Sequence, residues 1–359
     1  TDEGLIAFDT GDTKHDGELL LEAVRTVSDK PIKAIIYGHS HTVFGAGVLA
    51  EGNEDIQVIG HPNLNAVVEA NMKAAGAPAY FQELGPYLTA RMLIQFNAFM
   101  PTEGPDAWVV PTTLPEEMDM AFLPVNTPVE DGQEMTVLGQ KMQFFTQYGS
   151  DDKVHTTVWL PDREILFTTL LWSSPPQLYS VRGDVFRDPR EWIEGLKFNR
   201  NLEPEVLISA AARPVVGKDE VRKRLEGYLD GASFVLDQTL RGILGGKGPD
   251  DLRHLVRLPA YLQEVPNNLE NYGEGSSYTP AIYYQSVGWY DNDAAHLAPV
   301  APMDEAERIG PLRGGRDRVL AAAQPAMEKK EYSWAAQLVN YLDRLDPSDE
   351  EARTFKAEA

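Results

Sequence analysis

The feature that most constrains the fold is a Gly-His-Ser-His motif at residues 38–41, directly after an apolar run at residues 32–37. A β-branched and aliphatic run of this length predicts a buried strand. Two histidines one residue apart at a strand end can turn both imidazoles toward one metal ion, and zinc prefers imidazole and carboxylate ligands. A two-metal loop would continue with an acid and a third histidine, but this chain has Val43 and Phe44. The loop therefore predicts half of a metal site.

A third ligand has to come from elsewhere, and residues 148–155 combine carboxylates with a histidine. Either Asp151 or His155 would complete a three-ligand site, which can lower the pKa of a bound water towards neutrality. The alternative is that both histidines of the loop only form hydrogen bonds, while the acidic residues cap a turn.

The remaining pattern predicts a layered α/β domain followed by helices. A strand running into a turn, a helix and two further strands give a βαβ arrangement at residues 5–11, 16–28, 32–37 and 55–59. Alternating runs at residues 154–160 and 165–171 predict a hairpin. From residue 218 the pattern is helical, and the last helices resemble tetratricopeptide hairpins. We therefore expect one domain at residues 1–217 and a helical domain at residues 218–359.

Composition excludes several classes of function. The net charge of −23, from 55 acidic and 32 basic residues, repels phosphate backbones, so we expect no nucleic-acid partner. The absence of cysteine excludes disulfides, thiolate ligands and cysteine nucleophiles. No apolar run approaches the ~20 residues of a membrane-spanning helix. We expect a soluble protein, and the compartment stays open between cytoplasm and periplasm.

Several segments resemble one known family. Leu-Tyr-Ser-Val-Arg-Gly at residues 178–183, Asp-Gln-Thr-Leu-Arg at residues 237–241 and Gly-Trp-Tyr-Asp at residues 288–291 are similar to segments of the linear alkylsulfatases, a group of the metallo-β-lactamase superfamily. The resemblance covers nearly the whole chain. It implies an αββα sandwich followed by an all-α domain that forms a homodimer. The family's opening strands have no counterpart in this sequence, so we expect a fragment or a processed product.

The resemblance also implies a ligand set. His39 and His41 match the first two histidines of the family's His-x-His-x-Asp-His pattern, and Asp151 stands where the family has a glutamate ligand. The positions that match second-site and bridging ligands are apolar instead: Val43, Phe44, Leu170 (or Thr169 with a shifted gap), and Ala211 or Ala212. Random loss would affect both sites, so we expect one zinc ion rather than none.

The resemblance implies a substrate as well. Arg182 matches an arginine that resembles the family's sulfate contact, and Gln177 replaces a neighbouring asparagine. Apolar Val43 and Phe44 would suit the alkyl chain of a small amphipathic substrate. We therefore expect a hydrolase of an alkyl sulfate or related ester. The alternative is a metal-free homologue with a lyase or dehydratase reaction, or with a non-catalytic binding role.

Overall fold

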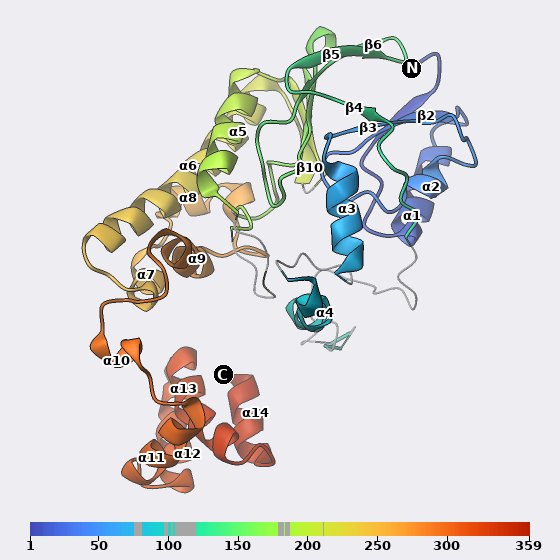
Figure 1. Cartoon of the computed structure of the whole chain (residues 1–359). Helices are drawn as coiled ribbons and strands as arrows, with labels where there is room; N and C mark the ends of the chain where they lie inside the picture. The colour runs from blue at the N-terminus through green and yellow to red at the C-terminus, as the bar shows by residue number, and fades with distance from the viewer. Residues whose placement is uncertain are drawn as a thin grey trace. The chain divides into compact units, whose positions relative to one another are not determined.

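The structure, a computed structural model, describes residues 1–74, 81–96, 100–101, 103–104, 120–178, 183, 187–210 and 212–359. The chain forms two compact units, Thr1–Trp289 and Tyr290–Ala359. The first unit contains both β-sheets, and the second unit is helical (Figure 1). No helix in the described ranges is long and apolar enough to cross a membrane.

A parallel sheet of four strands forms one half of the first unit. Its strands lie in chain order: β1 (Leu5–Phe8), β2 (Ile32–Ile36), β3 (Gln57–Gly60) and β4 (Thr127–Pro128). Three helices accompany this sheet: α1 (Lys14–Arg25), α2 (Ala46–Leu49) and α3 (Leu64–Lys73). Four of the five residues of β2 are buried and apolar, which is typical of a central parallel strand. The predicted strand before the His-Ser-His loop is confirmed.

A sheet of six strands forms the other half, in the order β10-β9-β8-β7-β6-β5. Its members are β5 (Gln133–Val137), β6 (Gln140–Phe145), β7 (Thr157–Leu160), β8 (Ile165–Thr168), β9 (Val206–Ser209) and β10 (Ala212–Val216). Neighbouring strands are antiparallel except β8 and β9. The hairpin predicted from the alternating runs is the β7–β8 pair, in which Leu160 lies opposite Ile165.

Three apolar layers hold the first unit together. The inner layer lies between the sheets and joins Ala34, Ile36 and Ile59 to Phe144 and Val158. The second layer covers the outer face of the parallel sheet with side chains of α2 and α3. The third packs the six-stranded sheet against α5 (Pro189–Asn201) and α6 (Lys218–Leu244). Helices therefore cover both outer faces (Figure 1), and the expected αββα sandwich is confirmed.

Helix α6 begins at Lys218, where the sequence pattern changes to helical. Its residues Val221, Leu225 and Tyr228 are buried in the same cluster as Trp159 of β7. The compact unit continues to Trp289 through α7 (Pro249–Leu255), α8 (Ala260–Gln263) and α9 (Gly275–Val287). The two compact units separate after Trp289, within the predicted helical domain. This separation concerns another boundary, so the predicted division between residues 217 and 218 stays a prediction.

The second unit consists of short helices around a small core. They are α10 (Ala294–Leu297), α11 (Pro302–Leu312), α12 (Arg316–Glu328), α13 (Tyr332–Leu345) and α14 (Glu350–Glu358). The core contains Val319, Ala323, Leu338, Val339, Leu342 and Ala352.

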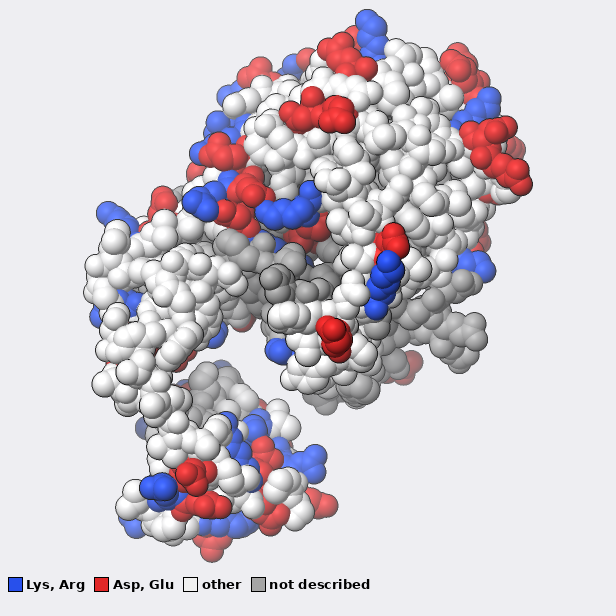
Figure 2. Space-filling model, viewed as in Figure 1, with Lys and Arg blue, Asp and Glu red and all other residues white. Residues whose placement is uncertain are grey.

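On the faces shown in Figure 2, acidic side chains lie among basic ones instead of forming one patch, which agrees with a solubilising role for the negative charge.

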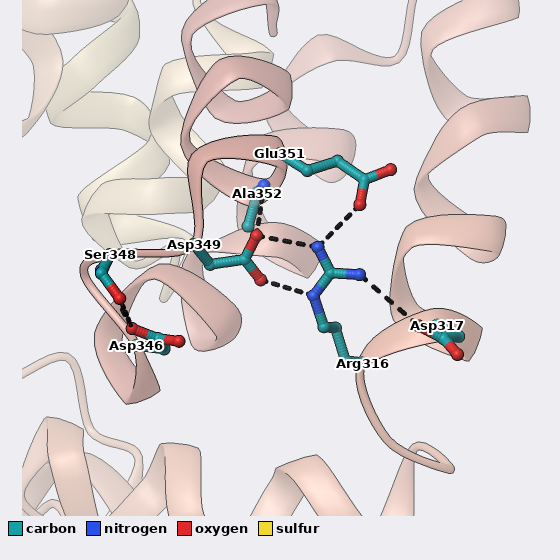
Figure 3. A network of polar contacts seen from close by, with 7 residues as sticks. All are labelled: Arg316, Asp317, Asp346, Ser348, Asp349, Glu351 and Ala352. Atoms are coloured by element: carbon teal, nitrogen blue, oxygen red, sulfur yellow. Dashed lines mark hydrogen bonds and ion pairs between the residues drawn. The ribbon is translucent and has the colours of Figure 1, made fainter.

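A polar network joins the starts of α12 and α14 (Figure 3). The guanidinium of Arg316 donates to both carboxylate oxygens of Asp349, at 2.6 and 2.8 Å, and to Glu351 at 2.7 Å. Asp349 also accepts a hydrogen bond from the backbone N–H of Ala352, as an N-cap of α14. The hydrogen bonds from Arg316 lower the pKa of Asp349 to about 2. The network therefore fixes the start of α14 beside α12.

We expect Arg316→Ala to speed amide exchange in α12 and α14, measured by hydrogen–deuterium exchange of the full chain. The effect should shrink at high salt, because exposed ion pairs are screened. Since the pKa of Asp349 is lowered, the stabilisation is present above pH 3.8 and is lost as the pH falls towards about 2. Arg353→Ala, on the exposed face of α14, is the matched control. Equal exchange in both variants would contradict this account.

Candidate metal centre

The His-Ser-His loop is held by a buried carboxylate at its first residue. The backbone N–H of Gly38 donates to Asp9 Oδ1 at 2.7 Å. A side chain at residue 38 would not fit, because a Cβ there would lie 2.8 Å from Asp9 Oδ2 and 2.8 Å from Thr169 Cγ2. Glycine is therefore required where β2 turns into the loop.

The loop that follows β1 runs beside the histidine loop. The backbone N–H of Thr10 donates to the carbonyl of Thr42 at 2.8 Å, and Gly11 forms an isolated parallel bridge with Val43. The carboxyl ends of parallel strands meet at one sheet edge, which brings the two loops together. Thr42 Oγ1 also lies 3.3 Å from His39 Nδ1. Nε2 of His39 is therefore the nitrogen better placed to bind a metal ion.

His39, His41 and Asp151 converge at this edge. One potential ligand atom from each lies within 4.8 Å of the others, and the two imidazole centroids are 5.0 Å apart. His39 and Asp151 are buried, whereas the His41 side chain is 31% exposed. The cluster is thus anchored in the protein and open to solvent on one side, and no second group of this kind occurs in the described ranges.

Without a metal, two of these groups neutralise each other. His41 Nδ1 lies 2.8 Å from Asp151 Oδ2. Burial alone would lower the pKa of His41, but the charge and hydrogen bond of Asp151 raise it to about 9. Burial would raise the pKa of Asp151, but His41 holds it well below its ordinary value of 3.8. The pair is therefore an imidazolium with a carboxylate at neutral pH.

His155, the alternative third ligand, makes other contacts. It is fully buried, with Nε2 2.8 Å from Thr157 Oγ1 and Nδ1 2.6 Å from Thr169 Oγ1. Burial lowers its pKa to about 4, so the imidazole is neutral. A metal would have to displace one of these hydroxyl groups, which leaves Asp151 as the better-placed candidate.

Three of the positions that the resemblance matches to second-site ligands pack in apolar clusters. Val43 and Leu170 have no exposed surface, and Phe44 packs partly buried beside Val43. Gly195 of α5 makes room for Leu170, because a Cβ there would lie 2.6 Å from Leu170 Cδ1. A substrate would reach Val43 only if its surroundings opened, so its predicted substrate contact stays a prediction. Ala211 lies outside the described residues, and Ala212 begins β10.

Of the two predicted sulfate contacts, Gln177 and Arg182, only Gln177 lies among the described residues. Gln177 is 3% exposed, and its Oε1 has no hydrogen-bond partner among the described residues. Arg182 lies outside the described residues, so its predicted role stays a prediction. The structure adds Arg187, a buried cation that donates to the backbone carbonyl of Gln177 at 3.0 Å. Its charge acts on both His41 and Asp151, and lowers the pKa of each.

Sequence reasoning missed Arg187 and two acidic groups. Asp12 lies within electrostatic reach of His39, His41 and Asp151, and Asp152 accepts hydrogen bonds from the histidine loop. The sequence carries no signal for the contact of Arg187, since it is made to a backbone carbonyl. For Asp152, its place next to Asp151 is the available signal, but the sequence alone is equally well explained by a turn cap.

We expect His41→Gln to lower the free energy of unfolding of the zinc-free protein by about 3 kcal/mol near neutral pH, because Asp151 would be left buried without its partner. The raised pKa of His41 means that the pair stabilises fully below its ordinary pKa of 6.5 and is lost as the pH rises through about 9. The difference between variant and wild type should shrink over that range in denaturant titrations. His296→Gln, in the exposed pair with Asp291, is the control; an equal loss there would count against this account.

The comparisons with known proteins agree with one another. Residues 248–359 match the family model for alkyl sulfatase dimerisation. A linear primary-alkylsulfatase from a Pseudomonas species is 32% identical, over 99% of this chain and 67% of that protein. An alkyl/aryl-sulfatase from Saccharomyces cerevisiae is 27% identical, over 92% of this chain and 52% of that protein. The chain therefore spans two thirds of one relative and about half of the other.

A solved structure supports the same assignment. The stereoselective inverting sec-alkylsulfatase from a Pseudomonas species has a TM-score of 0.83 and 25% sequence identity to this chain. The match covers 99% of this chain and 57% of that one, so it includes both the sandwich and the helices after it. The chain belongs to the alkylsulfatase family.

Proposed function

We propose that this chain hydrolyses the sulfate ester of a long-chain alcohol, using one zinc ion held by His39, His41 and Asp151. The observation that carries the proposal is the convergence of these three side chains within 4.8 Å, in a chain whose relatives are named alkylsulfatases. Hydrolysis adds water to the ester and gives the alcohol and hydrogen sulfate.

The residues present fit a zinc ion. Two imidazoles and one carboxylate are a typical donor set of catalytic zinc, which keeps a further position open. A zinc ion bound there would polarise a sulfate oxygen and activate water as a Lewis acid. The proton shared by His41 and Asp151 would leave in exchange, which keeps the buried carboxylate compensated by a positive charge.

The protein's own groups would bind and orient the substrate. We assign the sulfate group to Gln177 and Arg182, with the nearby buried charge of Arg187 favouring an anion there. Phe44, partly buried at the end of the histidine loop, is the candidate contact for the alkyl chain. The assignment of Arg182 is supported by its match to the family pattern. Gln177 would contribute through its side-chain NH₂ group, because sulfate oxygens accept hydrogen bonds and do not donate them.

One metal rather than two is supported by packing. A second ion would need oxygen or nitrogen ligands where Val43 and Leu170 pack without exposed surface. Leu170 fits against Gly195, and its backbone carbonyl accepts a hydrogen bond from the indole of Trp192 at 2.8 Å. These contacts complete the core at a position where the resemblance implies a bridging carboxylate.

A second candidate function is a metal-free role, either non-catalytic binding of an amphipathic ligand or a lyase-type reaction. The observation that favours it is the His41–Asp151 ion pair, which satisfies two of the three ligands without any metal. Zinc content separates the two candidates.

We expect protein purified without chelator to bind about one zinc per chain and to hydrolyse a linear long-chain alkyl sulfate. Chelation should abolish both, and added zinc should restore both. His39→Ala should lower zinc content and reduce kcat/KM at least 100-fold, whereas His254→Ala, an exposed histidine of α7, should change neither. Metal analysis and sulfate release measure the two quantities. A zinc content near zero after reconstitution would favour the metal-free role.

We also propose that the chain forms a homodimer through its alkyl sulfatase dimerisation region. Large apolar side chains in this region are exposed in the single chain: Tyr284, Val287, Trp289, Leu297, Val300 and Met303. Exposed apolar surface of this kind is typical of protein interfaces.

We expect sedimentation to show a dimer at micromolar concentration. Val287→Asp should raise the dimer dissociation constant at least tenfold, because a charge would be buried in the interface. Leu244→Asp, which is 89% exposed and lies before the matched region, should leave it unchanged. A monomeric wild type would refute the proposed homodimer.

A further inference from the structure

We propose that Asp152 is the positioning residue of the zinc site, fixing the loop of His39 and His41 against the loop of Asp151. This inference rests on the proposed zinc function. Asp152 follows the candidate ligand Asp151 in the chain, and the two carboxylate oxygens of Asp152 accept hydrogen bonds from different loops.

One oxygen binds the histidine loop at its centre. Asp152 Oδ2 accepts a hydrogen bond from the backbone N–H of Ser40 at 2.8 Å, and a second, short one from the Ser40 hydroxyl. Ser40 is the residue between the two histidines, and it is buried. A carboxylate bound to its N–H therefore fixes the backbone from which both imidazoles project.

The other oxygen holds the loop that carries Asp151. Asp152 Oδ1 accepts from the backbone N–H of Val154 at 2.7 Å, and the Asp152 carbonyl accepts from the N–H of Ser150 at 3.1 Å. The hydroxyl of Ser150 in turn donates to Asp151 Oδ1 at 2.9 Å. Asp152 thus shapes the turn that carries the third ligand.

A turn cap alone does not explain this arrangement. Capping this turn requires only the bond to Val154, but Asp152 also joins a segment 112 residues away in the chain. Asp152 is not among the side chains whose ligand atoms converge within 4.8 Å, so it supports the ligands rather than serving as one. Hydrogen bonds that orient metal ligands are worth about 10–100-fold in metal affinity.

The chemistry of the position makes Asn a sharp substitution. The side-chain oxygen of an asparagine can accept from one of the two loops, but its NH₂ group would face the N–H of the other. Asp152→Asn therefore keeps the size of the side chain and breaks the connection between the loops. Ser40→Ala removes only the hydroxyl contact and leaves the backbone hydrogen bond in place.

The test is a competition titration of zinc against a chromophoric chelator, with full-chain wild type, Asp152→Asn, Ser40→Ala and the control Asp162→Asn. Asp162 is exposed in the β7–β8 turn. We expect about 10–100-fold weaker zinc binding in Asp152→Asn, a smaller loss in Ser40→Ala, and none in the control. The melting temperature of Asp152→Asn should stay close to that of wild type. A general loss of structure would lower the melting temperature together with the zinc affinity, so this measurement separates the two causes.

A second measurement reads the connection without any metal. In the chelator-treated protein, Asp152→Asn should speed hydrogen exchange in the peptides that contain Ser40 and Val154, while Asp162→Asn should not. Zinc affinity within twofold of wild type, or unchanged exchange, would overturn the inference. A wild type that binds zinc but releases no sulfate would instead refute the proposed hydrolysis, and the affinities would still decide the role of Asp152.

Discussion

The histidine loop of the candidate centre begins at a buried hydrogen bond, from the backbone N–H of Gly38 to the carboxylate of Asp9. Through it the end of β1 holds the end of β2, and Thr169 after β8 closes the same space from the opposite sheet. Burial raises the pKa of Asp9, so this carboxylate is kept in an unfavourable place by the fold around it. His39 and His41 come one and three residues after Gly38, so this hydrogen bond fixes the backbone at the start of the segment that carries both imidazoles.

Two different environments lie beyond that point. On one side, polar groups neutralise each other, as the His41–Asp151 pair shows. On the other side, Val43 and Leu170 pack like ordinary core residues. Apolar side chains at these positions stabilise the fold without a metal, whereas carboxylates there would need one to offset their desolvation. The fold thus places a compensated polar pair and closely packed apolar side chains in the same region of the first unit.

Hydrophobic periodicity and turn residues predict the helices and strands that form from neighbouring residues in the chain. The strand before His39, the β7–β8 hairpin and the helical character after Lys218 follow from hydrophobic periodicity and turn residues. The contacts of Asp152 and Arg187 could not be predicted in this way, because Asp152 bonds to a residue 112 positions away and Arg187 to a backbone carbonyl. His155 has the right chemistry for a ligand, but only the three-dimensional structure shows that both its nitrogens face hydroxyl groups.

The accommodation of Leu170 by Gly195 limits which side chains residue 170 can carry. A glutamate placed at residue 170 alone would lie in an apolar core near the indole of Trp192, with apolar side chains at residues 43 and 44. Such an unpaired carboxylate costs several kcal/mol, so this single substitution would destabilise the protein. A second metal ion at this position would therefore require several substitutions at once, whereas the cluster of His39, His41 and Asp151 can be altered one residue at a time.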